Sequence, residues 1–143
     1  MKLLSALLLG TLLLTAASIL PHGVSEEEEA VRAAIDHYFQ GHATGDGSHF
    51  EQVFHPEAKL FWMRDSQFNQ RTSTAYIAGA SGVPPEDEAE RKRRITDIDI
   101  TGDAAVVRVE LDYPGALITD YMSMLKVDGR WQIVNKIFHV EPK

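Results

Sequence analysis

The second half of the chain consists of apolar, β-branched runs separated by short turn signals, and this pattern constrains the fold more than any other. The runs cover residues 94–100, 104–113, 118–127 and 130–140. Gly102-Asp103 and Asp128-Gly129 are two-residue hairpin signals, and Pro114-Gly115 breaks the run between them. The pattern predicts a mostly antiparallel sheet, in which Asp128-Gly129 closes the last hairpin.

The first half of the chain begins with a helical pattern. Ser25 to Glu28 is a capping box, in which the Ser25 hydroxyl and the Glu28 carboxylate each accept a hydrogen bond from the other residue's backbone amide. Apolar residues then recur at helical spacing, at Val31, Ala34, Ile35, Tyr38 and Phe39. Gly41 and Gly45 end this helix, and the apolar stripe indicates that one of its faces is buried.

Shorter segments connect this helix to the strands. They are a short helix capped by Ser48 and ended by His55-Pro56, a buried strand over residues 58–64, a turn at Asp65-Ser66, a third helix over residues 75–80 capped by Ser73 or Thr74, and a loop over residues 82–90. Helices that come first and strands that follow indicate an α+β fold, with the helices covering one face of the sheet.

The composition excludes several classes of protein. A chain of 143 residues has the length of one domain, and 44% of apolar residues supply a core for it. The net charge of −7 argues against nucleic-acid binding, which needs a surplus of Lys and Arg. The chain has no cysteine, which excludes disulfides, thiolate metal ligands and cysteine nucleophiles.

Residues 1–18 are typical of a signal peptide. Lys2 supplies the positive start, residues 3–14 form a short apolar region, and small residues follow at 15–18. The alternative is a transmembrane anchor, because the apolar run reaches Leu20. We expect cleavage and export to a secreted or periplasmic location, with residues 19–143 as a single domain that has no stable membrane insertion.

The last hairpin supplies candidate acid–base residues. A regular hairpin at Asp128-Gly129 places Asp120 opposite Ile137, so that Asp120, Asn135 and His139 share one face. Tyr121 and Lys136 then share the other face, and a bulge anywhere in the hairpin would exchange the two sets. Asp120, His139 and Tyr121 are the candidate catalytic residues. The alternative is that Asp120 and Asn135 make only structural hydrogen bonds.

Large aromatic side chains suggest a ligand pocket. They lie on the first helix, the first strand and the last strand, at Tyr38, Phe39, Phe61, Trp62, Trp131 and Phe138. Tyr38, Phe39, Phe61 and Trp62, together with the amide of Asn135, are the predicted ligand-binding residues, and they suit a small hydrophobic or aromatic molecule. The alternative is that these rings only fill the core.

Two further features have plain explanations. His37 and His42 are five residues apart, which is not the spacing that places two imidazoles on one helical face, so no metal site is predicted. The basic run of residues 91–94 either meets an anionic ligand or balances the acidic residues of the preceding segment, 86–90. We expect the second.

Three elements carry a resemblance to a known family. They are Phe54-His55-Pro56-Glu57-Ala58, Thr119-Asp120-Tyr121, and residues 125–139, which include Asp128-Gly129-Arg130-Trp131. With them, residues 26–139 resemble the nuclear transport factor 2-like (cystatin-like) superfamily, and more narrowly its lumazine-binding, SnoaL-like group. The resemblance implies a curved sheet wrapped into a cone by three helices, a pocket at the wide mouth, and a homodimer formed through the sheet.

The superfamily includes isomerases, dehydratases, cyclases and binding domains, so the fold does not select one activity. The expected function is an exported domain that binds a small molecule and needs no cofactor. A small isomerase or dehydratase with an acid–base pocket is the alternative, and a non-catalytic dimerisation domain is a further one.

Overall fold

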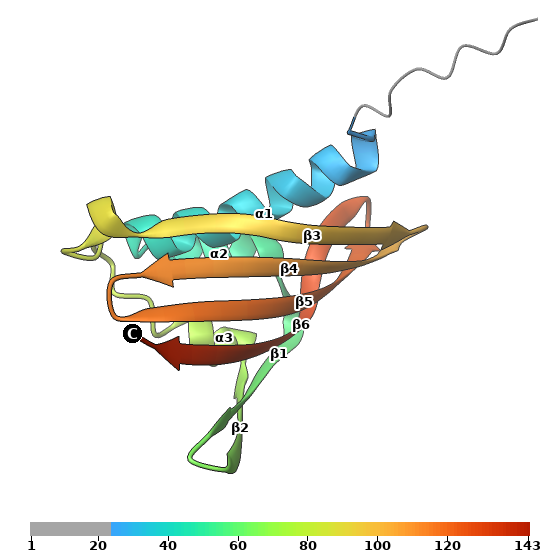
Figure 1. The fold of residues 1–143 in the computed structure, drawn as a ribbon. Coiled ribbons are helices and arrows are strands. Elements are labelled where there is room, and N and C mark those ends of the chain that lie inside the picture. Colours follow the sequence, from blue (N-terminus) through green and yellow to red (C-terminus); the bar gives the residue numbers. More distant parts are fainter. Residues whose placement is uncertain (1–23) are drawn as a thin grey trace, which may run out of the picture.

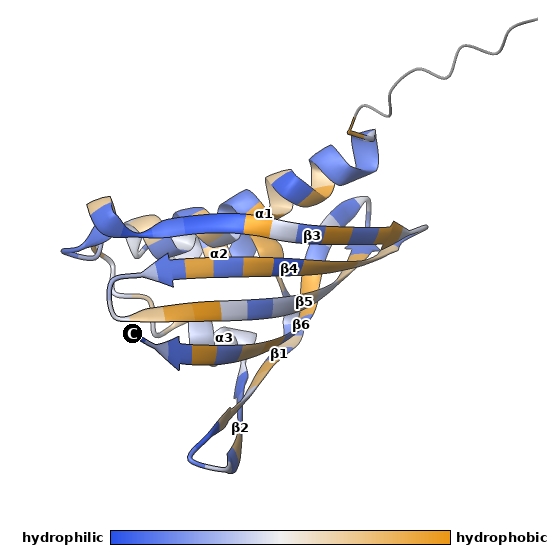
Figure 2. Cartoon of the chain, viewed as in Figure 1, coloured by the Kyte–Doolittle hydropathy of each residue, from blue (hydrophilic) through white to orange (hydrophobic). Residues whose placement is uncertain are grey.

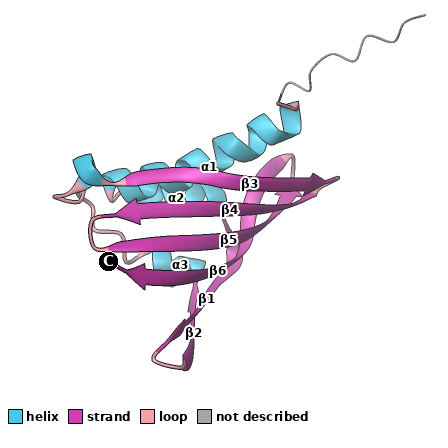
Figure 3. Ribbon diagram, viewed as in Figure 1, coloured by secondary structure: helices cyan, strands magenta, loops and turns pink. Residues whose placement is uncertain are grey.

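The computed structural model describes residues 24–143, and the predicted leader of residues 1–18 lies outside them. Within this range three α-helices precede most of a six-stranded sheet, as the sequence predicts for an α+β fold. The sheet curves around the helices without closing into a barrel (Figures 1 and 3). In order along the chain, the helices and strands are α1 (Glu26–Thr44), α2 (Gly47–Val53), β1 (Phe54–Arg64), β2 (Gln67–Thr72), α3 (Ser73–Ile77), a 3-10 helix (Glu88–Glu90), β3 (Lys92–Thr101), β4 (Ala104–Tyr113), β5 (Ala116–Val127) and β6 (Arg130–Pro142).

The strands are ordered β2-β1-β6-β5-β4-β3 across the sheet. Neighbours pair antiparallel except β1 and β6, which are parallel. The long last hairpin therefore lies in the middle, and the first strand returns to pair with the last. This arrangement brings residues near position 60 beside residues near position 137.

The helix ends follow local hydrogen bonding, and several predicted boundaries are corrected. Helix α2 ends at Val53, so His55-Pro56 lies in β1, and α3 covers Ser73–Ile77 instead of residues 75–80. The Ser25 hydroxyl accepts from the Glu28 amide at 3.1 Å, as predicted, but Asp46 caps α2 in place of Ser48, and Thr72 caps α3. Helix α1 also continues past Gly41. This glycine is explained by packing, because a Cβ at this position would lie 2.5 Å from the Phe50 ring. It ends at Gly45, which has a φ of 71°.

Strand β2 was not predicted, because its residues are polar apart from Phe68 and are almost all exposed. The predicted turn at Asp65-Ser66 is present, with φ values of 51° and 61°, and it returns the chain along β1. As an edge strand, β2 has no second neighbour within the described residues and no buried face to give it an alternating pattern. It forms one wall of the candidate site.

The core lies between α1 and the inner, concave face of the sheet. Val31, Ile35 and Tyr38 of α1 are fully buried against strand residues such as Val107 and Met122. The strands accordingly alternate between apolar and polar residues (Figure 2). None of the helices within residues 24–143 is long and apolar enough to span a membrane.

A β-bulge in the last hairpin changes which residues face the core. Met124 pairs with Ile133 as expected, but Ser123 then pairs with Asn135, so Val134 is the extra residue. Beyond the bulge Asp120 pairs with Phe138 instead of Ile137. The predicted face assignment for the far end of the hairpin is therefore wrong by one residue.

Candidate functional site

Three polar side chains meet inside the core, between α1, β5 and β6. The Tyr38 hydroxyl donates to Asp120 Oδ2 at 2.7 Å, and Lys136 Nζ donates to Asp120 Oδ1 at 3.0 Å and to the Tyr38 oxygen at 2.8 Å. Tyr38 and Asp120 have no exposed surface, and Lys136 is 4% exposed. A buried ion pair of this kind stabilises a fold poorly compared with apolar packing, so its presence points to a function.

Aromatic rings surround the Lys136 ammonium group. Its Nζ lies 5.1 Å from the centre of the Tyr38 ring, 5.6 Å from that of Tyr76 and 4.6 Å from that of Phe138. Rings at this distance attract a cation through their negative faces. The positive charge is thereby held immediately behind Tyr76 and Phe138, two rings that line a cavity.

Tyr76 and His42 connect this network to the surface cavities. The Tyr76 oxygen lies 3.0 Å from His42 Nε2, and the His42 ring is 4.6 Å from the Tyr38 ring. Burial lowers the pKa of His42 well below its usual value, and the positive charges of Lys136, Arg93 and Arg91 lower it further. Burial also raises the pKa values of Tyr38 and Tyr76, with Asp120 as the next largest cause. At neutral pH His42 is thus a neutral imidazole and Tyr76 is a neutral phenol.

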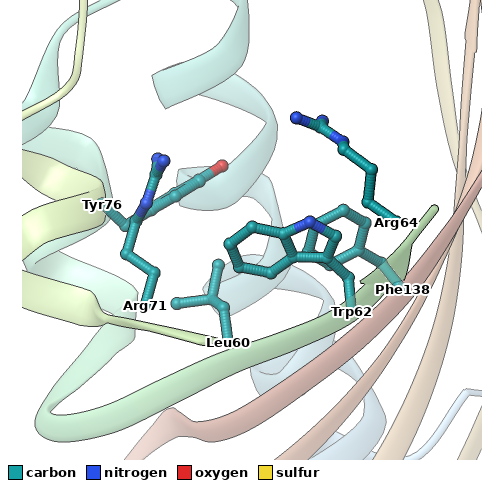
Figure 4. A pocket seen from close by; sticks show the side chains of 6 residues that line it. All are labelled: Leu60, Trp62, Arg64, Arg71, Tyr76 and Phe138. Carbon is teal, nitrogen blue, oxygen red and sulfur yellow. The ribbon is translucent and has the colours of Figure 1, made fainter. Parts of the chain in front are cut away.

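Two cavities adjoin the pair and share Tyr76 and Arg71. The first has a volume of about 170 Å³ and is lined by Leu60, Trp62, Arg64, Arg71, Tyr76 and Phe138 (Figure 4). The second, of about 270 Å³, lies between α1, α3 and the loop before β3, with His42, Arg71, Tyr76 and Arg91 among its lining residues. Tyr76 lines both cavities and His42 lines the second, and both residues contact the buried network of Tyr38, Asp120 and Lys136.

The three candidate catalytic residues are separated by the sheet. Asp120 points into the core, whereas Tyr121 and His139 lie on the outer, convex face, where both line an exposed groove. The bulge at Val134 also moves Asn135 to the outer side, where it pairs with Ser123 and Lys59. The expectation that Asp120, Asn135 and His139 share a face is therefore wrong, and Lys136 takes the place beside Asp120.

The structure distributes the predicted ligand-binding residues among three environments. Trp62 lines the first cavity, and Tyr38 belongs to the buried network behind it. Phe39 packs against the core, while Phe61 lies with Asn135 on the outer face. Trp62 is thus the predicted ring that reaches the cavity beside Tyr76.

Sequence reasoning missed four residues of the site, Lys136, His42, Tyr76 and Arg71. One signal was available, since Tyr38 and His42 are four residues apart and so lie on the same side of α1. Lys136 was assigned to the wrong face because bulges leave no clear trace in the sequence. Arg71 lies on the unpredicted strand β2.

Two arginines of the basic run of residues 91–94, at the start of β3, pair with the acidic segment that precedes it, as expected. Arg93 forms a bidentate ion pair with Glu88, with Nη1–Oε1 and Nη2–Oε2 distances of 2.6 and 2.7 Å. Arg91 Nε lies 2.7 Å from Asp87 Oδ1. The hydrogen bond from Arg93 lowers the pKa of the Glu88 carboxyl. Arg91 also stacks over Tyr113, with 4.3 Å between its guanidinium carbon and the ring centre.

Comparison with known proteins places this geometry in a family. The family model described as "Putative lumazine-binding" matches residues 26–139. The chain belongs to this family of nuclear transport factor 2-like proteins. The match covers α1 through most of β6, and so includes every residue of the buried network.

Three relatives illustrate the similarity. The chain is 32% identical over 124 residues to "Aldolase FrzH" of Cladobotryum sp., which covers 85% of this chain and 98% of that protein. A nuclear transport factor 2-like protein of unknown function from Shewanella baltica OS155 superposes with a TM-score of 0.74 at 28% identity, over 82% of this chain and 96% of its own. A similar one from Methylobacillus flagellatus KT has a TM-score of 0.70 at 30% identity, over 82% and 95%.

Proposed function

We propose that the chain is an enzyme that removes a proton from the carbon next to a carbonyl group in a small molecule bound at Tyr76. The observation that carries this proposal is the buried network of Tyr38, Asp120 and Lys136, whose Tyr38 ring packs against His42 and whose Lys136 ammonium group lies behind Tyr76 at the cavities. Buried charges are retained at a cost in stability, and here they lie directly behind the cavity wall.

The proposed step follows from the protonation states of the two residues at the cavities. The Tyr76 hydroxyl has one proton, which it donates either to His42 Nε2 or to a ligand carbonyl oxygen. When the ligand takes this hydrogen bond, the lone pair of the neutral His42 imidazole is free. The C–H proton moves to His42 Nε2, and the electron pair of the C–H bond forms an enolate whose oxygen is stabilised by Tyr76.

Lys136 and Asp120 act behind Tyr76 as positioning residues. The ammonium charge 5.6 Å from the Tyr76 ring centre favours the negative charge that develops on the enolate oxygen. Asp120 and Tyr38 fix the ammonium group in place through the hydrogen bonds at 2.8 and 3.0 Å. The positive charge is therefore already in place when the substrate binds.

The aldolase relative supports this reaction class. An aldol reaction begins with an enolate or its equivalent, which then attacks the carbonyl carbon of an aldehyde, and the new alkoxide takes up a proton. The relative named an aldolase is 32% identical and aligns over 98% of its length. We accordingly propose aldol-type chemistry as the activity, in place of the isomerase or dehydratase alternative.

Deuterium exchange tests the first step without knowledge of the second substrate. The probes are phenylacetone and phenylpyruvate in D₂O, and proton NMR follows loss of the methylene signal. We expect the chain to accelerate exchange of at least one probe over buffer. Tyr76→Phe and His42→Gln should each reduce the acceleration on the order of a hundredfold. Tyr121→Phe on the outer face is the matched control and should change nothing.

Two results would contradict the proposal. If neither probe exchanges faster than in buffer, although one of them binds, the chain is a binding domain and not an enzyme of this class. If cyanoborohydride traps the ketone on Lys136, with a mass gain equal to that of the ketone less one oxygen atom, this lysine forms a covalent imine and does not act through its charge alone.

We further propose that two copies of the chain associate through the outer face of the sheet. Met63, Phe68, Tyr121 and Ile137 are 44–66% exposed there, which is typical of an association surface.

Export through the leader of residues 1–18 is a separate proposal, and it rests on the sequence pattern alone.

A further inference from the structure

The charged residues that line the first cavity are all positive, although the chain as a whole is acidic. Its lining residues include two arginines, Arg64 and Arg71, and no carboxylate. The second cavity, which shares Arg71 and also contains Arg91, again has no carboxylate in its lining. The whole sequence has 21 acidic and 14 basic residues, so acids would be expected to balance these arginines.

We propose that the first cavity binds an aromatic carboxylate, with Arg71 as the residue that recognises the negative group. The proposal names the substrate class of the proposed function and rests on it for the identity of the bound molecule as a substrate. Its support comes from three observations on the lining residues, which concern charge, an unpaired donor, and the shape and size of the apolar wall.

The first observation is that both arginines at the cavity are free of acidic partners. Among residues 24–143, no carboxylate lies within ion-pair distance of Arg64 or Arg71. Most other arginines in this range do form such pairs: Arg32, Arg91, Arg93, Arg94 and Arg108. A guanidinium group offers parallel N–H donors that match the two oxygens of a carboxylate, so Arg64 and Arg71 can bind an anionic ligand.

The second observation is an unpaired donor in the same wall. Trp62 Nε1 is buried and has no hydrogen-bond partner. An unsatisfied buried N–H is costly, and the cost disappears if a ligand supplies an acceptor. Figure 4 shows this nitrogen on the same side of the indole as the guanidinium groups of Arg64 and Arg71 and the Tyr76 hydroxyl. The other tryptophan differs, because Trp131 Nε1 donates to Glu27 at 3.0 Å.

The third observation concerns the apolar part of the ligand. Trp62 and Phe138 stack with their ring centres 5.3 Å apart and an angle of 25° between planes, and Leu60 completes this wall. A cavity of about 170 Å³ holds a single benzene-sized ring, by comparison with engineered cavities that bind benzene. Flat aromatic surfaces favour a flat partner.

These positions give the ligand an orientation. The ring lies against Trp62 and Phe138, the carboxylate meets Arg71, and a carbonyl between them reaches Tyr76, which both cavities share. A carboxylate attached directly to the carbonyl carbon satisfies all three contacts. Aryl 2-oxo acids have this connectivity, and we place the substrate in that class.

Isothermal titration of the whole chain with three probes tests the inference. Phenylpyruvate has the ring, the ketone and the carboxylate, phenylacetone lacks the carboxylate, and pyruvate lacks the ring. We expect phenylpyruvate to bind between tenfold and a hundredfold more tightly than either of the others, the range that a charged hydrogen bond supplies. Arg71→Gln should remove the preference over phenylacetone, whereas Arg130→Gln, at the exposed start of β6, should retain it.

Equal affinities for phenylpyruvate and phenylacetone would overturn the inference, and so would an unchanged preference in Arg71→Gln. Trp62→Phe keeps an aromatic ring and removes the N–H, so a lower affinity for phenylpyruvate alone supports the role of Nε1. Binding is measured without turnover. A chain that prefers phenylpyruvate but exchanges no proton therefore upholds this inference and contradicts the proposed enzyme. A chain that exchanges a proton without preferring phenylpyruvate contradicts this inference and upholds the proposed enzyme.

Discussion

The two faces of the sheet at β5 and β6 differ in a way that packing alone does not explain. On the inner face, which is covered by α1, Asp120 and Lys136 bury opposite charges. On the outer face, Tyr121 and Ile137 are adjacent to them in sequence and are 44% and 50% exposed. Charges lie inside and apolar side chains outside, the reverse of the arrangement that favours a stable monomer.

In our proposals, this inversion separates two functions across one layer of backbone. The inner face holds the network beside Tyr76 and the cavities, and the outer face has the exposed apolar side chains through which we propose that two copies associate. Neighbouring residues on a strand point to opposite sides of the sheet, so a shift of one position moves a side chain from one face to the other. The bulge at Val134 causes such a shift and determines which residues at the far end of β6 face the network.

The largest expected effect comes from removing one charge on the inner face. Lys136→Met leaves the Asp120 carboxylate buried without its partner, which typically costs about 3–5 kcal/mol of unfolding free energy. Chemical denaturation followed by circular dichroism measures this loss. Lys59→Met, an exposed lysine on β1, is the matched control and should change stability by less than about 0.5 kcal/mol.

The double variant Asp120→Leu with Lys136→Met sharpens this prediction. Replacing a whole buried ion pair with apolar residues is often neutral or stabilising, so the double variant should be more stable than Lys136→Met alone. It should nevertheless lack proton exchange. A double variant that retained full exchange activity would remove the ion pair from the mechanism.

The two tryptophans test whether the cavity is open or is part of the packed core. Trp131 is 4% exposed, and its replacement by alanine should cost about 3–5 kcal/mol. Trp62 is only partly buried and lies on the cavity, so Trp62→Ala should cost about 1–2 kcal/mol and weaken ligand binding. Denaturation of both variants, with titration of phenylpyruvate, measures the two effects. Equal stability losses would show that Trp62 is ordinary core.

The outer face is tested by a charge placed within it. Ile137→Glu should prevent self-association because two copies would bury like charges against each other, and sedimentation velocity over a range of concentrations measures the change. Val83→Glu, an exposed apolar position in the loop before β3, should leave association unchanged. A monomeric wild-type chain at all concentrations would contradict association through this face.

The sequence predicted the fold better than the site because the two depend on different information. Turn dipeptides such as Asp128-Gly129 and the stripe on α1 act locally, so element types and the antiparallel order follow from them. The site depends on a bulge, on an edge strand that carries Arg71, and on the parallel pairing of β1 with β6. These are long-range features, and the residues that produce them have no distinctive spacing.

The smallest effect concerns His42, which faces the inner network. Burial lowers its pKa in the folded chain, whereas in the unfolded chain it should titrate near its usual value of about 6.5. As the pH falls through that value, His42 becomes protonated in the unfolded chain but stays neutral in the folded chain, so the free energy of unfolding decreases. His42→Gln lacks this titration. The stability difference between the wild type and the variant should therefore be greatest above pH 7 and should shrink steadily towards pH 5. Denaturation at several pH values measures it, and a difference that stays constant would show that His42 is protonated equally in both states.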